Sequence, residues 1–356
     1  MAGGKSETAR RGARRDPAAA AAAALEAALR DRWEPDWTRL GPWPAPNGWS
    51  LAPDALRLAA RLVRRWRPRH IVEFGSGFST RVLAQACAAV GLPAGISSVD
   101  HDPEFGRAPR LDARTRAAGV RLRHQVAPLV ARDCGGKLLP LYGLRPERLA
   151  STRPADLALI DGPPVNLGGR EGTLYQIMDL ARPGTLVLLD DAGRASERAA
   201  CACWQANLGE AIAVRRLPGF ARGLAAVIVR EPVPRRALWE RKLEATRREI
   251  EALTAPGETF ILAEDGQSLP AWSGGRRAVP LVCRGGVDWG APADSAAAAR
   301  ELERRRREGA GHFALLWTAA WWRETYAGFF ERLRAKFRCV ADHDRLLMFD
   351  LRRRPR

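Results

Sequence analysis

The sequence has no long uninterrupted apolar run, although apolar residues make up 46% of its 356 positions. A helix that crosses a bilayer needs roughly 20 consecutive apolar residues, so no membrane span is predicted. The apolar share, beside 28% charged residues, also excludes a wholly disordered chain, because enough apolar surface is present for a sizeable core. We therefore expect a soluble globular protein of two domains, or of one large domain with an extension.

Cysteine is scarce and scattered, and none of the six cysteines belongs to a Cys-x-x-Cys pair. Cys201 and Cys203 are separated by one residue with no histidine nearby, which is a poor pattern for a metal site. A chain of this length does not need disulfide bonds, so we expect reduced thiols and a cytoplasmic location. The alanine-rich segment 18–25 resembles a secretory signal, but Glu26, Arg30 and Asp31 continue it as a charged helix.

Lysine is nearly absent, since 54 of the 58 basic residues are arginine. The formal net charge of +18 would ordinarily indicate a nucleic acid or an anionic surface as partner. Arginine in such excess, beside many alanines, glycines and prolines, is typical of a GC-rich bacterial coding sequence. The densest arginine runs, 304–307 and 352–354, contain no aromatic residues for base stacking, so we expect mostly solvated faces.

Strand and helix patterns alternate between residues 51 and 232. We expect strands at 70–74, 95–99, 120–124, 156–160, 185–189, 211–217 and 223–229, and helices at 54–66, 80–90, 173–180 and 195–206. This alternation predicts a doubly wound α/β fold with a mostly parallel seven-stranded sheet. The last two strands are joined too tightly for a crossover helix, so they form an antiparallel terminal hairpin.

The rest of the chain divides into four parts. These are a disordered basic arm at 1–17, a helix and a Trp/Pro-rich segment at 18–50, a linker helix at 233–255 and a smaller α/β domain at 256–356. The smaller domain is expected to have strands at 259–263, 278–282, 312–317 and 339–351, with helices at 294–308 and 323–336. The apolar positions of 237–253 repeat over barely two heptads, which favours an interdomain helix over a coiled coil.

A glycine-rich turn follows the first strand, in the segment Ile-Val-Glu-Phe-Gly-Ser-Gly-Phe-Ser-Thr at 71–80. Gly75 and Gly77 lie where the chain must turn sharply, and they let a ligand approach the backbone without a Cβ in the way. Ser79 or Thr80 can cap the next helix, whose N-terminus favours an anionic group. A tight strand-to-helix turn without any ligand is the alternative interpretation.

Asp100 strengthens the ligand interpretation, because it ends the second strand. A carboxylate at that place can accept hydrogen bonds from both hydroxyls of a ribose, so an adenosine-containing cofactor is predicted. Thr80 stands where a dinucleotide motif has its third glycine, and Glu73 precedes the turn. Both departures weaken a nicotinamide or flavin interpretation.

Four segments, VEFGSGFST, SVDHD, LIDGPP and LLDD, resemble successive strand ends of a class I S-adenosylmethionine-dependent methyltransferase. The resemblance covers about residues 50–230 and includes the predicted strand arrangement. It implies a cofactor site formed by Glu73, Gly75, Ser76, Gly77, Ser79, Asp100 and His101. The usual adenine contact falls near Ala127 and Pro128, where the acidic residue of the family is missing.

Asp161, Asp190 and Asp191 end the fourth and fifth strands, so their carboxylates are expected at one edge of the sheet. Three such oxygen ligands suit Mg²⁺, which would orient a substrate hydroxyl and lower its pKa. Catechol-type O-methyltransferases have acidic residues at similar strand ends, with asparagine at the last position. The alternative is that Asp190 or Asp191 caps the next helix and Asp161 opens a turn.

The resemblance also places Asp161 near the sulfonium and the substrate, as the candidate catalytic residue. Arg170 and Tyr175 follow it in a glycine-rich segment and are candidate substrate contacts. The alternative for them is a solvated arginine and a packed tyrosine. His101 could act as a base or contact the cofactor.

The C-terminal region resembles segments appended to bacterial glycosyltransferases of surface-polysaccharide assembly. The residues that carry this resemblance are 311–317, the Trp321–Trp322 pair and 337–351. Trp317, Trp321 and Trp322 could stack on a sugar or pack in a core.

Together these features predict an S-adenosylmethionine-dependent methyltransferase acting on a small-molecule or glycan hydroxyl, with the second domain helping to select the acceptor. One alternative is a non-catalytic binding or scaffold protein of surface-polysaccharide biosynthesis. An RNA methyltransferase is favoured by the charge alone, and the chain lacks an Asn-Pro-Pro-Tyr-type motif. The sequence predicts no oligomeric state.

Overall fold

The computed structural model describes residues 16–40, 50–104, 111–265, 273–284 and 287–355. The chain forms two compact units. The first comprises Met1–Ala131, Pro140–Ala199 and Glu210–Val233, and the second comprises Arg132–Leu139, Ala200–Gly209 and Pro234–Arg356. The arm expected at 1–17 lies almost entirely outside the described residues. No described helix is long and apolar enough to cross a membrane.

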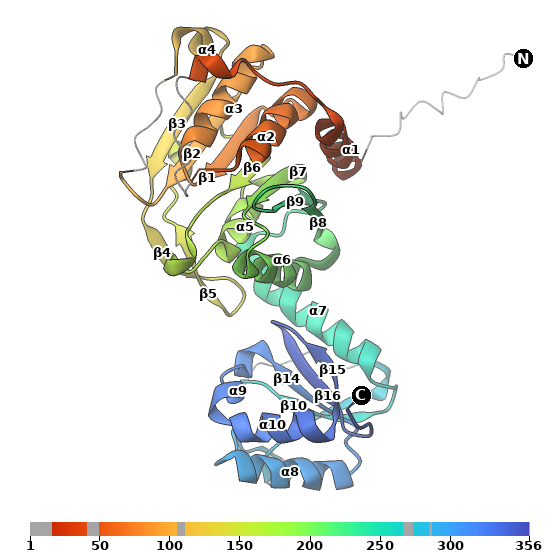
Figure 1. Cartoon of the computed structure of the whole chain (residues 1–356). Helices are drawn as coiled ribbons and strands as arrows, with labels where there is room; N and C mark the ends of the chain where they lie inside the picture. The colour runs from red at the N-terminus through yellow and green to blue at the C-terminus, as the bar shows by residue number, and fades with distance from the viewer. Residues whose placement is uncertain (1–15, 41–49, 105–110, 266–272, 285–286, 356) are drawn as a thin grey trace, which may run out of the picture. The chain divides into compact units, whose positions relative to one another are not determined.

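The first unit contains the predicted seven-stranded sheet (Figure 1). Its strands are β1 (His70–Phe74), β2 (Gly95–Asp100), β3 (Arg121–Val126), β6 (Ala155–Ile160), β7 (Ala181–Asp190), β8 (Ile212–Leu217) and β9 (Leu224–Val229). Their order is β3-β2-β1-β6-β7-β9-β8, and β9 runs antiparallel to both of its neighbours, β7 and β8. The doubly wound sheet and its antiparallel end are therefore confirmed.

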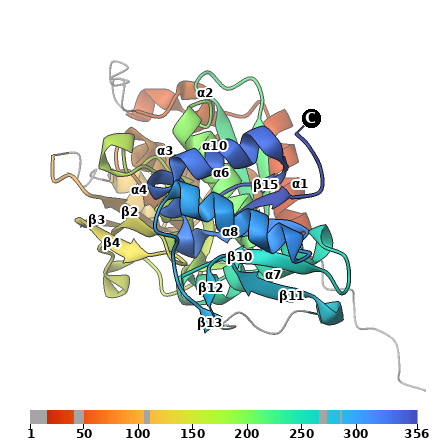
Figure 2. The ribbon, with the colours of Figure 1, turned by 90° about the horizontal axis from the view of Figure 1, so that it is seen from below.

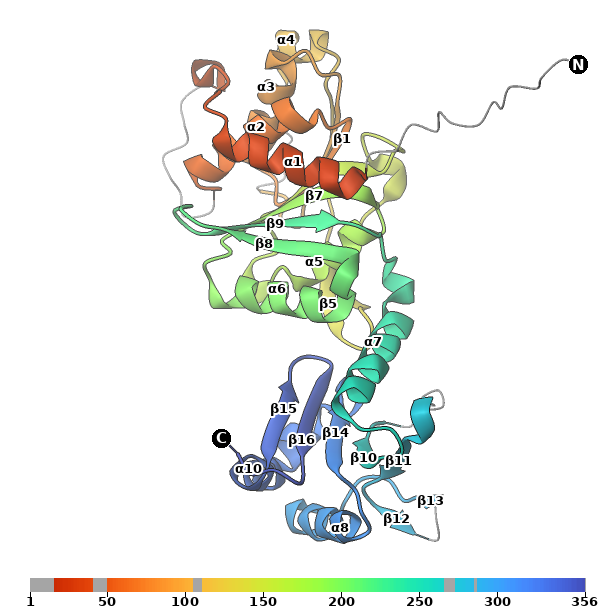
Figure 3. The same cartoon turned by 90° about the vertical axis from the view of Figure 1, so that its right-hand side faces the viewer.

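Burial explains why the central strands form. Every residue of β1, β2 and β6 is buried, as expected for parallel strands with both faces covered. Helices α1 (Pro17–Arg30), α2 (Pro53–Trp66) and α3 (Phe78–Ala89) contribute to the core cluster on one face. In α2 the apolar stripe is buried and the arginines occupy the other side. Helix α5 (Glu171–Met178) lies on the opposite side of the sheet from α1 (Figure 3).

Three elements of this part of the chain were not predicted. They are α4 (Ala113–Ala117) and the two-stranded sheet of β4 (Leu129–Asp133) and β5 (Leu138–Tyr142). Because strand β4 is almost wholly exposed, neither of its faces needs apolar residues. Its sequence therefore lacks the alternation of apolar and polar residues that predicts a half-buried strand. Strand β5 contains Pro140, which argues against a strand in a sequence-based prediction. Helix α6 (Ala195–Leu208) follows β7 as expected.

The second unit is built on a separate five-stranded sheet. Its strands are β10 (Thr259–Ala263), β11 (Arg277–Pro280), β14 (His312–Leu316), β15 (Arg338–Asp342) and β16 (Leu346–Asp350), in the order β11-β10-β14-β16-β15. The first three run parallel, whereas β16 is antiparallel to both its neighbours. Two short strands, β12 (Cys283–Arg284) and β13 (Val287–Asp288), pair separately. The predicted smaller α/β fold is thus present.

Helices cover both faces of this second sheet. Helices α8 (Ser295–Arg307) and α10 (Ala327–Lys336) pack side by side over one face (Figure 2). Helix α7 (Leu238–Leu253) packs its apolar side against the other face. The helix expected at 323–336 is instead broken into α9 (Trp322–Thr325) and α10 at Tyr326, whose ψ is 42°. The Tyr326 hydroxyl donates a hydrogen bond to the carbonyl of Pro292, which fixes the break.

Short 3-10 helices complete the described structure. They are η1 (Trp37–Leu40), η2 (Pro146–Arg148), η3 (Val165–Leu167), η4 (Gly209–Ala211), η5 (Arg235–Ala237), η6 (Ser273–Gly275) and η7 (Trp317–Ala319).

Candidate functional site

The candidate site lies at the carboxyl edge of the first sheet, where β1, β2, β6 and β7 end. Two backbone hydrogen bonds join the loops there: the N–H of Gly75 donates to Val99, and the N–H of Asp161 donates to Phe74, at 2.9 and 2.8 Å. Ligands of doubly wound sheets bind outside this edge. The sheet therefore brings the glycine loop, Asp100 and the acidic strand ends to one place.

Close packing determines the shape of the glycine loop. Gly75 has a φ of +98°, and a Cβ there would lie 3.0 Å from the Cβ of Asp161 and 3.2 Å from the nitrogen of Gly162. A larger residue would therefore strain the backbone and press β1 and β6 apart. A Cβ at Gly77 would meet nothing within 4 Å, so the space beside Gly77 is open. The loop is tight against the protein at Gly75 and open at Gly77.

Glu73 lies beneath this loop and is completely buried. Its Oε2 accepts hydrogen bonds from the hydroxyls of Thr80 and Ser98, whereas its Oε1 has no partner. Burial raises the pKa of Glu73 to about 7, although hydroxyl hydrogen bonds lower it. A buried carboxylate oxygen without a partner is costly, so the residue fits a ligand with a cationic donor such as an amino group.

Asp100 is 5% exposed at the end of β2. Its Oδ2 accepts from the N–H of Ser76 at 2.7 Å, and its Oδ1 accepts from the N–H of Asp102 at 2.9 Å. The Nδ1 of His101 is 3.2 Å from Oδ1. Each carboxylate oxygen has two lone pairs, so Asp100 can still accept the two hydroxyls of a ribose. The residues fit an adenosine cofactor at this end.

The structure places the remaining predicted cofactor residues around the same loop. Ser76 donates or accepts a hydrogen bond with the Ser98 hydroxyl at 2.7 Å, and Ser79 is buried at the start of α3. The N–H of Gly77 donates to the hydroxyl of Thr80. Ala127, at the expected adenine position, is buried, and its N–H donates to the carbonyl of Asp100. The assigned roles of these residues stay predictions.

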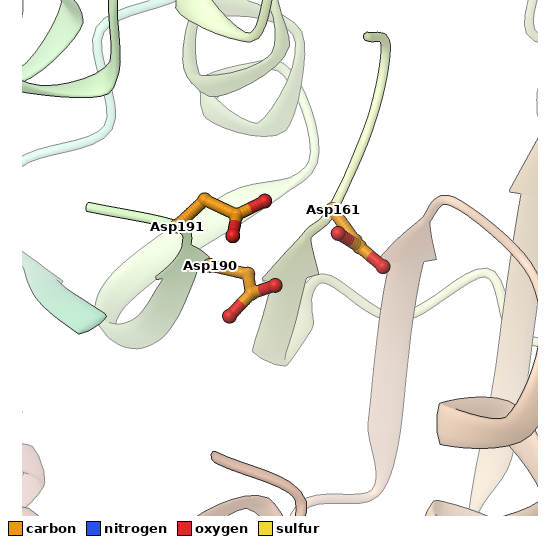
Figure 4. Close-up of side chains that lie close together, drawn as sticks. All are labelled: Asp161, Asp190 and Asp191. Carbon is orange, nitrogen blue, oxygen red and sulfur yellow. The ribbon is translucent and has the colours of Figure 1, made fainter. Parts of the chain in front are cut away.

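Asp161, Asp190 and Asp191 converge at the ends of β6 and β7, as their places in the sequence predict. Each offers one carboxylate oxygen to a group whose members lie within 4.8 Å of one another. Figure 4 shows the Asp161 carboxylate beside those of Asp190 and Asp191, which extend from the neighbouring strand end. Asp191 has a φ of +56°, a left-handed conformation that aspartate tolerates better than most residues.

Arg170 lies among these carboxylates. Its Nη2 donates to Oδ1 of Asp161 and to Oδ2 of Asp191, both at 3.0 Å. Its Nη1 donates to the carbonyl of Asp190 at 2.7 Å, and its Nε is 3.8 Å from Glu197. The side chain is only 5% exposed, so Arg170 is not the solvated loop residue of the alternative interpretation. Tyr175 is buried on α5, 1% exposed, as that alternative describes.

The pKa values of Asp161 and Asp190 are both raised. Burial raises the pKa of Asp161 well above its usual value, against the lowering influence of Arg170. Burial and the charge of Asp191 raise the pKa of Asp190 to about 6, and neither oxygen of Asp190 has a partner. The cluster can therefore hold or release a proton near neutral pH.

The residues present do not fit the predicted Mg²⁺. Oxygens of Asp161 and Asp191 already accept from one guanidinium nitrogen, so two of the three candidate ligands are engaged by a cation. Mg²⁺ requires oxygen ligands at about 2.1 Å in octahedral geometry, and a second positive charge beside Arg170 would be repelled. No chemistry is assigned to a metal here.

Sequence reasoning missed Tyr142, which is 2% exposed at the end of β5. Its ring centroid is 5.1 Å from that of Phe74, and its hydroxyl has no partner. A Cβ at Gly162 would collide with this hydroxyl. The sequence feature that could have indicated this hairpin is the Gly135–Gly136 pair, because adjacent glycines between two short strand-like segments are typical of a hairpin turn.

Comparisons with known proteins agree with the fold at this edge. Residues 72–192 match the family model described as a methyltransferase domain. The matched segment begins in β1 and ends just after β7, so it includes the glycine loop, Asp100 and all three clustered aspartates. No curated protein matches the chain significantly.

Three solved structures illustrate the similarity. The O-methyltransferase from Bacillus cereus in complex with SAH is 15% identical, with 59% of this chain and 90% of that chain covered and a TM-score of 0.37. The SAH-bound Podospora anserina methyltransferase PaMTH1 is 17% identical, with 63% and 100% covered and a TM-score of 0.35. The O-methyltransferase TomG from Streptomyces achromogenes is 16% identical, with 59% and 89% covered and a TM-score of 0.34. Identities and TM-scores this low carry no argument about activity, and the methyltransferase-domain model matches residues 72–192 alone.

Proposed function

We propose that the chain is an S-adenosylmethionine-dependent O-methyltransferase that acts on the hydroxyl of a small molecule or glycan. The observation that carries the proposal is the meeting of the glycine loop, Asp100 and an acidic cluster at one carboxyl edge. The methyltransferase-domain match over residues 72–192 supports it, because the matched segment spans all three features.

The chain's own residues would hold the cofactor at both ends. The unpartnered Oε1 of Glu73 and the open space at Gly77 suit its amino acid end. The carboxylate of Asp100 suits the ribose, with Ser76 holding that carboxylate in place and His101 beside it. When bound, S-adenosylmethionine supplies a methyl group that its sulfonium has already activated. The protein must then align the acceptor and remove its proton.

Asp161 is our candidate for the group that receives that proton. Its side chain is 14% exposed, against 4% for Asp191, so it is the more accessible of the two carboxylates paired with Arg170. Because its pKa is raised, the carboxylate of Asp161 binds a proton more readily than an ordinary aspartate does, as a general base requires. Val165 and Leu167, exposed on η3 just after Asp161, offer apolar contact to an acceptor. These features favour an acceptor with both a hydroxyl and an apolar part.

Calorimetric titration with S-adenosylhomocysteine tests the cofactor site. The wild-type protein should bind at micromolar concentration, and Asp100→Asn should lose most of that affinity because the ribose loses a charged acceptor. Asp288→Asn, an exposed position on β13, serves as the matched control and should bind like the wild type. A folded wild-type protein that binds no S-adenosylhomocysteine would contradict the proposal.

Tritium transfer from labelled S-adenosylmethionine to panels of phenols, other small alcohols and oligosaccharides then tests the acceptor class. Transfer to a phenol or alcohol identifies a small-molecule enzyme, whereas transfer to an oligosaccharide alone supports a role in polysaccharide biosynthesis. Cofactor binding without transfer to any acceptor would favour a non-catalytic binding protein.

A further inference from the structure

The acidic cluster at the ends of β6 and β7 contains a positive charge of its own. The Arg170 guanidinium makes three hydrogen bonds there, to Asp161, to Asp191 and to the backbone of Asp190. It therefore contacts all three residues whose carboxylates would otherwise form a cation site. Glu197, 2% exposed, adds a fourth carboxylate on the Nε side of the same guanidinium.

The position of Arg170 is built into the fold. The residue lies immediately before α5, after the turn at Gly168 and Gly169, both with positive φ. A Cβ at Gly168 would press against Pro140, so the turn is packed closely on β5. Because the side chain is almost fully buried and bonded to two strand ends, it cannot leave without uncovering several carboxylates.

A guanidinium differs from a bound metal in its chemistry. It stays charged throughout the physiological pH range, and its planar fork can bond two carboxylates in fixed directions. It offers no Lewis-acid coordination and cannot be removed by a chelator. It can hold a carboxylate in position and balance its charge, which is the electrostatic part of what a divalent ion does at such a site.

We propose that Arg170 is a built-in cation that takes the place of a divalent metal between β6 and β7, where it positions Asp161 for methyl transfer. The catalytic part of this inference, that Asp161 is positioned for methyl transfer, rests on the proposed function. Its structural content is independent of that function. With Arg170 in place the cluster excludes a divalent ion. Without Arg170 the oxygens of Asp161 and Asp190 form a site for one, beside Asp191, which still pairs with the half-exposed Arg194. Asp190 would be the first available ligand, because both its oxygens are unpartnered.

Titration with Mn²⁺, followed by electron paramagnetic resonance of the free ion, tests the proposal on the full chain. Arg170→Ala should bind one Mn²⁺ more than tenfold more tightly than the wild type. Arg170→Lys, which retains a positive charge, should bind no better than the wild type. Arg182→Ala is the matched control, since it removes another arginine that pairs with a buried aspartate, Asp156, in the same unit. It should not gain Mn²⁺ binding.

The outcomes separate this inference from the proposed function. Gain of a Mn²⁺ site in Arg170→Ala, and its loss in Arg170→Ala/Asp190→Asn, support the built-in cation. One Mn²⁺ bound by the wild type and lost in Asp190→Asn overturns it, as does a folded Arg170→Ala that binds none. If Arg170→Ala does not fold, Arg170→Gln replaces it. S-adenosylhomocysteine titration of the same samples reports separately on the proposed function, because Mn²⁺ binding requires neither cofactor nor acceptor.

Discussion

Each of the two units buries a cluster of charged residues, and the two clusters differ in how completely they are bonded. In the first unit the cluster lies at the carboxyl ends of parallel strands. One oxygen each of Glu73 and Asp191, and both oxygens of Asp190, have no hydrogen-bond partner. In the second unit the cluster lies at the amino ends of β10 and β14 and contains Glu258 and His312.

The cluster of the second unit satisfies its own charges. Glu258 accepts from His312 and from the N–H of Ala255. Asp350, at the end of β16, accepts from the backbone and the side chain of Arg352, both at 3.0 Å. Both oxygens of Glu258 accept hydrogen bonds, and the second oxygen of Asp350 lies 3.4 Å from Nε of Arg353, so these carboxylates are neutralised within the unit and stabilise the sheet. Partial bonding in the first unit is what indicates a binding site there.

The largest expected effect is a loss of methyl-transfer activity, and only the cluster of the first unit should show it. We expect Asp161→Asn to lower kcat for methyl transfer by about 10²- to 10⁴-fold, because the proton acceptor is lost. The affinity for S-adenosylhomocysteine should stay near that of the wild type. Steady-state kinetics with an identified acceptor measure this change, and an unchanged kcat would contradict the role of Asp161.

The converse effect is expected in the second unit. Glu258→Gln should lower the free energy of unfolding by about 2 kcal/mol, because the buried carboxylate that accepts hydrogen bonds from His312 and from Ala255 loses its charge. Methyl transfer and cofactor binding should be unaffected. Urea denaturation followed by tryptophan fluorescence measures the stability. Loss of activity in a folded Glu258→Gln protein would show that the fully bonded cluster is more than structural.

The two clusters should also respond to pH with opposite sign. The pKa of Glu73 is raised from 4.5 to about 7 by burial, so folding loses stability as pH rises between those values. Glu73→Gln should therefore be more stable than the wild type above pH 7, by roughly 3 kcal/mol. Urea denaturation of both proteins at a series of pH values checks this, and parallel stability curves would contradict it.

For Asp350, burial opposes the shift, but hydrogen bonds from Arg352 outweigh it and the pKa is lowered from 3.8. Asp350 therefore stabilises the fold above pH 3.8, and this contribution is lost as the pH falls through the lowered value. In acid, protonation of Asp350 should remove this stabilisation from the second unit, whereas protonation of Glu73 removes a destabilising buried charge from the first unit. Fluorescence-monitored unfolding in acid tests whether Asp350→Asn removes that part of the acid sensitivity.

The smallest effect concerns ion pairs that face solvent. Arg248 on α7 pairs with Glu244, with 74% and 40% of the two side chains exposed. Arg248→Ala should change the free energy of unfolding by less than about 0.5 kcal/mol, since solvent screens the pair. Thermal unfolding of this variant provides a baseline for the buried clusters. A loss as large as that of Glu258→Gln would mean that burial is not what distinguishes them.

Much of the fold could be predicted because it depends on local patterns. The buried strands β1 and β6 are short and mostly apolar, and residues at the ends of neighbouring parallel strands had to meet at one edge of the sheet. The convergence of Asp161 and Asp190 followed from that geometry alone. The glycine turn was visible because only glycine tolerates the backbone and the close approach found at Gly75.

Features that depend on side-chain direction could not be predicted. Arg170 stands in a glycine-rich loop, and its sequence neighbours give no indication that it turns inward between two strand ends. Tyr142 reaches the site from a hairpin that has no apolar alternation, so its position depends on tertiary contacts with Phe74. The break at Tyr326 depends on a hydrogen bond to Pro292, which is distant in sequence.

The packing of α7 has a consequence for how the second sheet could be exchanged between proteins by recombination. Ile250 of this helix is fully buried against Phe260, Ala314 and neighbouring residues of the second sheet. A gene fragment that began at the first strand of that sheet would encode a domain with one apolar face bare to water, prone to self-association. A recombination breakpoint that preserves a folded domain would therefore have to lie upstream of Leu238, so that α7 and the second sheet are transferred together.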